Sequence, residues 1–226
     1  MSKSWERVVL ACISVLIIPI TAQAGGKIAF GAKGAFAISS HWSAKEKGNG
    51  YSVESSTKNG FSAGVSASLV LTKIFKLQPE LHYVKKGSKQ TVTVPTFPYG
   101  DIDVTYKLDY LEIPLLLNAY PFRLPKLRPH TSIGPYVSFL LSSKYDFENE
   151  FLPNFEKEIE GIKETDFGIV FGTGIEYYTG LVSFSFDYRY SMGFVDLTLP
   201  TGPGFPEIEL RNNCHSFMLG IIAQGP

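Results

Sequence analysis

The stretch LVSFSFDYRYSMG, residues 181–193, decides the fold class because its side chains alternate between two kinds. Every second residue is apolar or aromatic, and these residues are Val182, Phe184, Phe186, Tyr188 and Tyr190. The residues between them are small, hydroxylic or charged. A period of two is typical of a β-strand with two different faces. In a soluble barrel the aromatic face points inward, whereas in a membrane barrel it points outward at lipid.

The composition favours a single β-rich domain. The chain has 226 residues, 14% aromatic residues and 21 glycines, which suits strands and turns. Lys plus Arg and Asp plus Glu both number 21, so there is no overall basic field, and we expect no nucleic-acid partner. Two cysteines, Cys12 and Cys214, are too few for a disulfide framework.

Residues 1–24 are predicted to be a signal peptide. Lys3 and Arg7 precede an apolar run over residues 8–20, and Ala22-Gln23-Ala24 forms a small-x-small cleavage site. The run is too short for a spanning helix. Cleavage would remove Cys12 and leave residues 25–226 as one domain. An exported chain without a long apolar run can span a membrane only as a closed barrel.

The two-faced alternation recurs along the rest of the chain. The further stretches are KIAFGAKGAFAIS (27–39), GFSAGVSASLVLT (60–72), KLQPELHYVKKG (76–87), DYLEIPLLLNAY (109–120), HTSIGPYVSFLL (130–141), TDFGIVFGTGIEYY (165–178) and CHSFMLGIIAQ (214–224). We therefore predict eight strands, each of about nine to eleven residues, the length that a tilted membrane strand needs.

The predicted connections alternate between short and long. The short ones lie around Lys73, at residues 121–128 and at Thr179-Gly180. The long ones have about twenty residues each, which is unusual in a compact soluble domain, and span residues 40–59, 85–105, 143–164 and 193–213. This arrangement is typical of outer-membrane barrels and would put both termini on the periplasmic side.

Two of the long connections carry further expectations. The third is acidic on balance, and residues 155–164 are predicted to form a short helix. It is interpreted as a solvated surface loop, with a site for a cation or a partner as the alternative. The fourth is rich in Pro and Gly and is expected to be irregular.

The small-residue face is predicted to point into the barrel. Gly and Ser dominate it, which suits the narrow lumen of an eight-stranded barrel, whereas a solvated face prefers Lys, Glu and Thr. The bulky face suits lipid, and the residues expected to contribute to interface girdles are Tyr83, Tyr177, Tyr188 and Tyr190. The alternative is a secreted lipocalin-like barrel, which shares the period but usually has shorter connections.

Prolines inside the proposed strands break the usual rule for sheets. Pro79, Pro114 and Pro135 each lack a backbone N–H donor, and a closed barrel has no edge strand to hold them. We expect them to mark bulges or strand ends.

Several charged residues fall on the inward face. They are Lys33, Glu80, His82, Glu112, Asp166, Glu176, Asp187 and Arg189. Buried charges must pair, so this lumen charge network is predicted to centre on Arg189 with Glu112, Glu176 or Asp187 as its partner. The favoured interpretation is a plug of salt bridges that closes the lumen, and the alternative is an ion path.

No catalytic, cofactor-binding or metal-binding residues are predicted. The histidines at positions 41, 82, 130 and 215 lack the spacing of a metal pair. His215 and Ser216 are adjacent, but neighbouring residues on a strand face opposite sides and cannot act as nucleophile and base. We therefore expect a protein that is not an enzyme and uses no cofactor.

The chain resembles the PorT-like family of outer-membrane β-barrel proteins. The resemblance rests on LQPELHYVKKG (77–87), YLEIPLLLNAY (110–120), IGPYVSFLL (133–141) and GIVFGTGIEYY (168–178). It implies an eight-stranded, porin-like barrel in the outer membrane of a Gram-negative cell. The family tolerates prolines at these positions, and its named member is a secretion accessory. The ending IIAQGP departs from common barrel practice because it lacks a terminal aromatic residue.

The sequence thus predicts an all-β fold, an eight-stranded antiparallel up-and-down transmembrane β-barrel. The predicted function is a non-enzymatic scaffold, surface-binding protein or secretion accessory. The alternatives are a small porin-like channel and a lipid-modifying barrel enzyme. The expected partners are outer-membrane lipid and an envelope or secretion-complex protein.

Overall fold

The computed structural model describes residues 28–42, 47–48, 51–93, 102–122, 124–148, 155–159, 161–199 and 208–224. The predicted signal peptide, residues 1–24, lies outside this part of the chain. Within the described residues no helix is long and apolar enough to cross a membrane.

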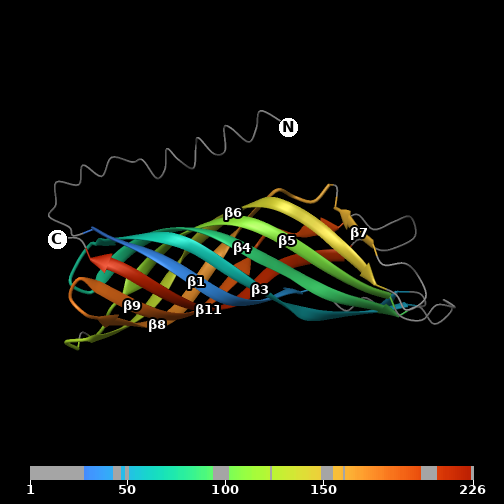
Figure 1. Ribbon diagram of the computed structural model, residues 1–226. Helices are drawn as coiled ribbons and strands as arrows, with labels where there is room; N and C mark the ends of the chain where they lie inside the picture. The colour runs from blue at the N-terminus through green and yellow to red at the C-terminus, as the bar shows by residue number, and fades with distance from the viewer. Residues whose placement is uncertain are drawn as a thin grey trace.

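Eight long strands form a closed antiparallel barrel (Figure 1). All strands of the sheet are β1 (Ile28–Trp42), β2 (Lys47–Gly48), β3 (Tyr51–Val70), β4 (Phe75–Thr93), β5 (Ile102–Ala119), β6 (Leu127–Glu148), β7 (Phe155–Glu158), β8 (Thr165–Tyr178), β9 (Val182–Gly193), β10 (Leu197–Leu199) and β11 (Ile208–Gln224). The ring runs β1-β11-β9-β8-β6-β5-β4-β3, and β3 pairs back with β1. The short strands β2, β7 and β10 pair with β3, β6 and β11. The predicted fold class is confirmed.

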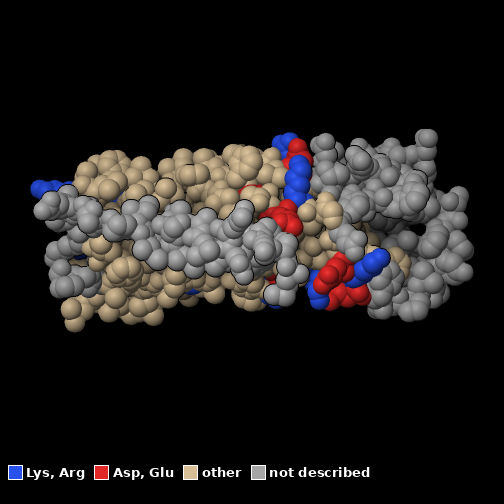
Figure 2. Space-filling view, turned by 90° about the horizontal axis from the view of Figure 1, so that it is seen from above, with Lys and Arg blue, Asp and Glu red and all other residues tan. Residues whose placement is uncertain are grey.

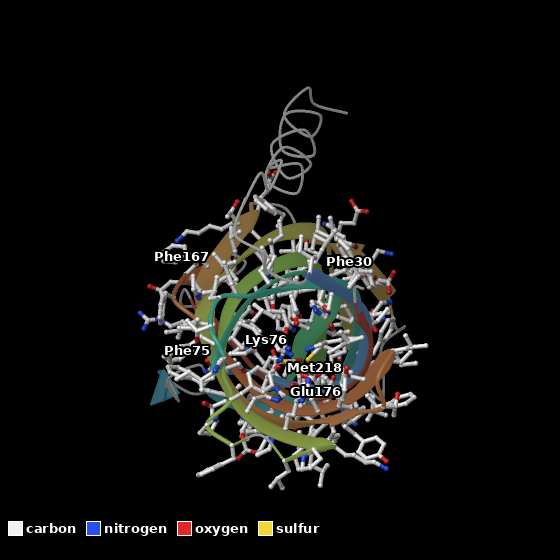
Figure 3. The ribbon with its side chains drawn as sticks, turned by 90° about the vertical axis from the view of Figure 1, so that its left-hand side faces the viewer. Phe30, Phe75, Lys76, Phe167, Glu176 and Met218 are labelled. Atoms are coloured by element: carbon white, nitrogen blue, oxygen red, sulfur yellow. The ribbon has the colours of Figure 1, made fainter. Side chains whose placement is uncertain are left out.

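The alternation along β9 shows which face looks outward. Phe186 is 51% exposed on the outer surface, whereas its neighbour Ser185 is 4% exposed and faces the lumen. The view along the barrel shows the same division, with Phe30, Phe75 and Phe167 outside the ring and Lys76, Glu176 and Met218 inside it (Figure 3). The period of two therefore places the aromatic face outward, as a membrane barrel requires.

The outer surface carries an apolar band with aromatic edges. On β4 the band ends at Tyr83, whose hydroxyl donates to Asp109 Oδ2 at 2.7 Å, and charged side chains begin at Lys85. Tyr188 and Tyr190 lie on the outer face of β9, and Tyr177 lies near the short turn after β8. Figure 2 shows the same boundary, with most acidic and basic atoms gathered past a long uncharged surface.

The strands are longer than predicted. β3, β4, β5 and β6 have 20, 19, 18 and 22 residues, whereas β8 and β9 have 14 and 12. The prediction of nine to eleven residues is wrong because pairing continues beyond the apolar band, through segments expected to be loops. We call this one-sided extension of β3, β4, β5 and β6 the tall wall. From Lys85 to Thr93, β4 continues for about 26 Å at ~3.3 Å per residue.

Two expectations for the long connections are also wrong. Residues 155–158 form strand β7 instead of a helix, because β8 begins opposite Phe139 and leaves the upper part of β6 to pair with β7. Part of the fourth connection is regular, since β10 pairs with β11. Residues 200–207 of that connection lie outside the described residues.

The prolines sit inside continuous strands instead of marking bulges or ends. The β4–β5 register is the same at Pro79↔Leu115 and at His82↔Glu112, although the two residue pairs between them are missing from the ladder. The β5–β6 register likewise continues from Pro114↔Tyr136 to Leu117↔Ile133. The bulges lie elsewhere, in β3 between Thr57 and Ser62 and between β5 and β6 near Asp109. The ladder therefore loses hydrogen bonds locally but keeps its alignment.

Candidate functional site

The predicted inward charges all lie in the lumen. The most exposed of the eight is Glu112 at 6%, and the full set is Lys33, Glu80, His82, Glu112, Asp166, Glu176, Asp187 and Arg189. They come from β1, β4, β5, β8 and β9, at the alternate positions that face inward. The structure sorts them into three clusters along the barrel axis.

The central cluster is built around one carboxylate. Arg189 donates from NH1 to Glu80 Oε2 at 2.5 Å and from NH2 to Glu80 Oε1 at 3.0 Å. Lys33 Nζ lies 3.2 Å from Glu80 Oε1 and 3.3 Å from Asp187 Oδ2. A two-pronged Arg–carboxylate pair is among the stronger charge-assisted contacts, and here it is fully enclosed.

The predicted partners of Arg189 are wrong. Glu112, Glu176 and Asp187 were expected, but the ion pair is made with Glu80 on β4. In the ring order β4 and β9 stand on opposite sides of the barrel. Side chains from opposite walls meet because an eight-stranded lumen is narrow. Arguments from sequence neighbours cannot predict which side chains meet across the lumen.

Two histidines complete the central cluster. His82 places Nε2 2.9 Å from Glu80 Oε2 and Nδ1 3.2 Å from Ser62 Oγ. His130 places Nε2 2.8 Å from Asp187 Oδ1. The order Ser62–His82–Glu80 has the serine–histidine–carboxylate connectivity of nucleophilic catalysis. Ser62, however, is only 5% exposed, inside the filled lumen.

The lower cluster lies toward the short turns. Lys76 Nζ is 3.0 Å from Glu176 Oε2, and the Tyr120 hydroxyl donates to the same oxygen at 3.1 Å. Lys76 also lies 4.4 Å from the centre of the Tyr120 ring. Arg128 NH1 is 3.9 Å from Glu176 Oε1. One buried carboxylate is therefore faced by two basic side chains.

The upper cluster lies toward the long connections. Lys86 Nζ is 2.5 Å from Glu112 Oε2 and 5.0 Å from the centre of the Tyr136 ring. Asp166 accepts hydrogen bonds from Asn212 Nδ2 at 3.0 Å and from the Tyr136 hydroxyl at 3.3 Å. Asp166 is thus held by neutral donors, unlike the other lumen carboxylates.

An apolar cap covers the upper cluster. Leu108 and Tyr110 of β5 pack with Ile162, which follows β7, and with Leu197 of β10. The partly buried side chains that join this group are Tyr106, Leu140, Ile159 and Val195. The cap therefore brings two of the long connections onto the inner face of the tall wall.

The space left between the central and upper clusters is small. A cavity of about 20 Å³ is lined by side chains that include His82, Lys86, Glu112 and Arg189, and it has room for roughly one water molecule. Cys214 also lines it, so the thiol lies inside the lumen partway along β11. Among the described residues no group of His, Cys, Asp and Glu is arranged to hold a metal ion.

Sequence reasoning missed several members of these clusters. Lys76 and Lys86 have the same parity on β4 as Glu80 and lie inside the predicted stretch 76–87, so the alternation itself already marks them as inward-facing. The same parity argument applies to Arg128 and His130 on β6. Tyrosine hydroxyls carry no such signal, because tyrosines occur on both faces.

The outer face of the tall wall is charged but internally paired. Lys89 Nζ lies 2.8 Å from Asp103 Oδ2, and Lys107 pairs with both Asp146 and Glu156. Lys144 donates to Glu156 Oε1 at 2.7 Å. Hydrogen bonds from Lys144 and then Lys107 lower the pKa of Glu156 to about 2. The acidic connection is therefore partly neutralised by lysines of the wall.

Comparisons with known proteins agree with this architecture. A family model described as outer membrane protein beta-barrel domain matches residues 21–199. No curated protein matches the chain. The outer membrane protein OprG from Pseudomonas aeruginosa is 12% identical, with 87% of this chain and 95% of that chain covered and a TM-score of 0.52. At this identity the likeness shows the fold alone.

Two further solved structures are similar over most of their length. Neisserial surface protein A is 14% identical, with 87% of this chain and 96% of that chain covered and a TM-score of 0.44. The attachment invasion locus protein Ail of Yersinia pestis, solved with the heparin analogue sucrose octasulfate, is 12% identical. Its match covers 88% of this chain and 98% of that chain, with a TM-score of 0.42.

Proposed function

Because the chain belongs to the family of outer membrane protein beta-barrel domains, we propose that it is a non-enzymatic outer-membrane barrel that acts as a scaffold, surface-binding protein or secretion accessory. The observation that carries this proposal is the tall wall. Four neighbouring strands continue past the apolar band and present an outer face of paired charges. A water-facing sheet of paired charges is a suitable platform for another molecule.

The lumen supports this function over a porin-like channel. The lower, central and upper clusters fill it with buried ion pairs, and the apolar cap lies above them. An ion crossing the barrel would have to separate these pairs in a region of low dielectric, where leaving one partner unpaired costs about 3–5 kcal/mol.

The lumen also supports a non-enzymatic role. Ser62, His82 and Glu80 are connected as a catalytic triad would be, but Glu80 is occupied by Arg189 and Lys33. The adjoining cavity of about 20 Å³ holds roughly one water molecule and no lipid. We interpret the serine and histidine as part of the polar packing.

The proposed orientation puts the short turns and both termini in the periplasm and the tall wall outside the cell, as in other outer-membrane barrels. Thr72→Cys in the short β3–β4 turn and Glu54→Cys on the tall wall test it, since both positions are exposed and Cys214 is buried. On intact cells a membrane-impermeant maleimide should label only Glu54→Cys. Labelling of Thr72→Cys alone would reverse the orientation.

The decisive experiment for function is site-specific photocrosslinking in cells. A photoreactive residue at Glu54 on the tall wall should crosslink to a defined envelope protein. The same residue at Phe171, which is exposed on the apolar band, should crosslink only to lipid. Absence of any protein adduct at the wall, together with a steady current through the barrel in planar bilayers, would favour the small porin instead.

The secretion-accessory form of the proposal rests on the PorT-like resemblance. It predicts that the crosslinked protein is a component of a secretion complex. Recovery of an extracellular matrix or host-surface component instead would favour the surface-binding form.

A further inference from the structure

The short-turn end of the barrel exposes unusually large apolar side chains. Leu181 is 84% exposed in the β8–β9 turn, and Phe122 is 69% exposed in the β5–β6 connection. Leu71 and Ile74 in the β3–β4 turn are also exposed. Turns that face water are usually polar, so these turns are suited to the boundary between hydrocarbon and headgroups.

The charges on these turns have one sign. Lys73 and Lys126 are exposed there, and no Asp or Glu occurs in residues 70–79, 113–145 or 177–186. On the face visible in Figure 2, the left-hand tip shows basic and no acidic atoms. The outer face of the tall wall differs, because its lysines are matched with carboxylates.

The turns are held side by side by the backbone. Tyr120 N donates to Ile74 O at 2.7 Å, which joins the β3–β4 turn to the end of β5. Tyr178 N donates to Lys126 O at 2.7 Å, which joins the β5–β6 connection to the end of β8. The Arg128 guanidinium lies 3.9 Å from the centre of the Tyr178 ring. We call Lys73 and Lys126, with these apolar turns, the rim. Arg128 lies beside the rim, with its guanidinium toward Glu176 of the lower cluster.

We propose that the rim binds the phosphate of anionic phospholipids in the leaflet around the short turns. The rim's cations lie among exposed apolar side chains at the edge of the apolar band. In a bilayer this edge lies at the depth of the phosphate groups. Lysine and arginine stems can lie along the apolar surface while their charged ends reach the phosphate. The inference is independent of the proposed function, since it concerns the opposite end of the barrel from the tall wall.

Phospholipid is favoured over a soluble anion by the apolar side chains. A free phosphate would use the cations alone and would gain nothing from Phe122 or Leu181. An acyl chain lies against these side chains while the headgroup meets the lysines. Each basic residue near an anionic surface is expected to contribute about fivefold in affinity.

Native mass spectrometry of the full chain tests the proposal. The folded barrel is mixed with equal amounts of phosphatidylglycerol and phosphatidylethanolamine of identical acyl chains. Wild type should retain phosphatidylglycerol preferentially. The Lys73→Gln/Lys126→Gln variant should lose roughly twenty-fivefold in phosphatidylglycerol retention, at about fivefold per lysine. Phosphatidylethanolamine retention should fall much less, because the ammonium group of this lipid already balances its phosphate.

The control makes the same charge change at the other end of the barrel. Lys144→Gln/Lys157→Gln removes two lysines near the tall wall and should leave the lipid preference intact. Arg128→Gln is tested separately because Arg128 also approaches Glu176. If it folds, as judged by heat-modifiable gel mobility, it should change the lipid preference far less than Lys73→Gln/Lys126→Gln, because the Arg128 charge faces the Glu176 carboxylate.

Three results would overturn the proposal. The first is equal retention of the two lipids by wild type. The second is an unchanged preference in Lys73→Gln/Lys126→Gln. The third is displacement of phosphatidylglycerol by an equal concentration of glycerol 3-phosphate, which would show a site for soluble phosphate in place of a lipid site.

Discussion

The Arg189 guanidinium and the Glu80 carboxylate meet across the lumen from opposite walls of the barrel, with two contacts of 2.5 and 3.0 Å. Glu80 also forms an ion pair with Lys33, whose Nζ lies 3.2 Å from Glu80 Oε1. The Glu80 carboxylate is therefore shared by two cations, Arg189 and Lys33. Within the described part of the chain, Arg189 forms its ion pair with Glu80 alone. Removing Glu80 and removing Arg189 should therefore change the free energy of unfolding by different amounts.

We expect Glu80→Gln to destabilise the barrel more than Arg189→Gln. Removing Glu80 leaves two buried cations with too little counter-charge, at about 3–5 kcal/mol. Removing Arg189 leaves Glu80 with Lys33. Thermal unfolding in detergent measures both. Arg211→Gln is the control, because its pair with Asp196 is exposed and such pairs are worth about 0–1 kcal/mol. A larger loss for Arg189→Gln than for Glu80→Gln would contradict this view of the cluster.

The two faces of β9 should respond differently to substitution. Phe186→Arg places a charge on the apolar band and should cost about 2–4 kcal/mol and impair assembly. Ser185→Ala, which removes the hydrogen bond from Ser185 Oγ to Asp187 Oδ2 at 3.1 Å, should cost only about 1 kcal/mol. Folding yield into lipid vesicles measures the contrast. Equal yields for the two variants would mean that the faces are assigned wrongly.

The tall wall should show a defined acid response at Glu156. Its pKa is lowered to about 2 by hydrogen bonds from Lys144 and Lys107, so the ion pairs stabilise the wall fully above the ordinary carboxyl pKa. This stabilisation is lost as the pH falls from there toward 2. Carbon-detected NMR titration of Glu156 measures the pKa directly. Lys144→Gln should raise it toward the ordinary value, and no movement would show that Lys144 is not its main partner.

The apolar cap should contribute to the stability of the barrel, but it should not be the only barrier to ions in the lumen. Leu197 is fully buried, so Leu197→Ala should cost about 2–5 kcal/mol. Leu124→Ala on the exposed rim is the matched control and should cost far less. In planar bilayers Leu197→Ala should pass no steady current, because the ion-paired clusters beneath still fill the lumen. A stable open channel in this variant would identify the cap as the only barrier.

Ser62 should be unreactive toward serine-directed probes. A fluorophosphonate needs access to the hydroxyl, and Ser62 is enclosed beside a cavity that holds about one water molecule. The folded barrel should therefore remain unlabelled when analysed by intact-mass spectrometry. Labelling that is absent from Ser62→Ala but present in wild type would revive the enzyme alternative.

The fold was predictable because alternation is a local property. Phe186 and Ser185 differ in kind, and this contrast alone assigns the two faces of β9. The same rule placed Glu80 and Arg189 in the lumen. Their pairing was not predictable, since it depends on the ring order and on the width of the lumen. Strand ends were mispredicted because Lys89 and Thr91 continue a strand in water, where no apolar contrast marks it.

The ring closes between strands that are far apart in the chain. β1 pairs with β11 along one side and with β3 along the other, so Ala29 lies opposite both Gln224 and Ser68. No fragment that stops before residue 208 can complete the circle, and each such fragment would leave two unpaired edges in the hydrocarbon. Closure of the barrel therefore waits for residues 208–224, and β1 keeps one unpaired edge until β11 is in place.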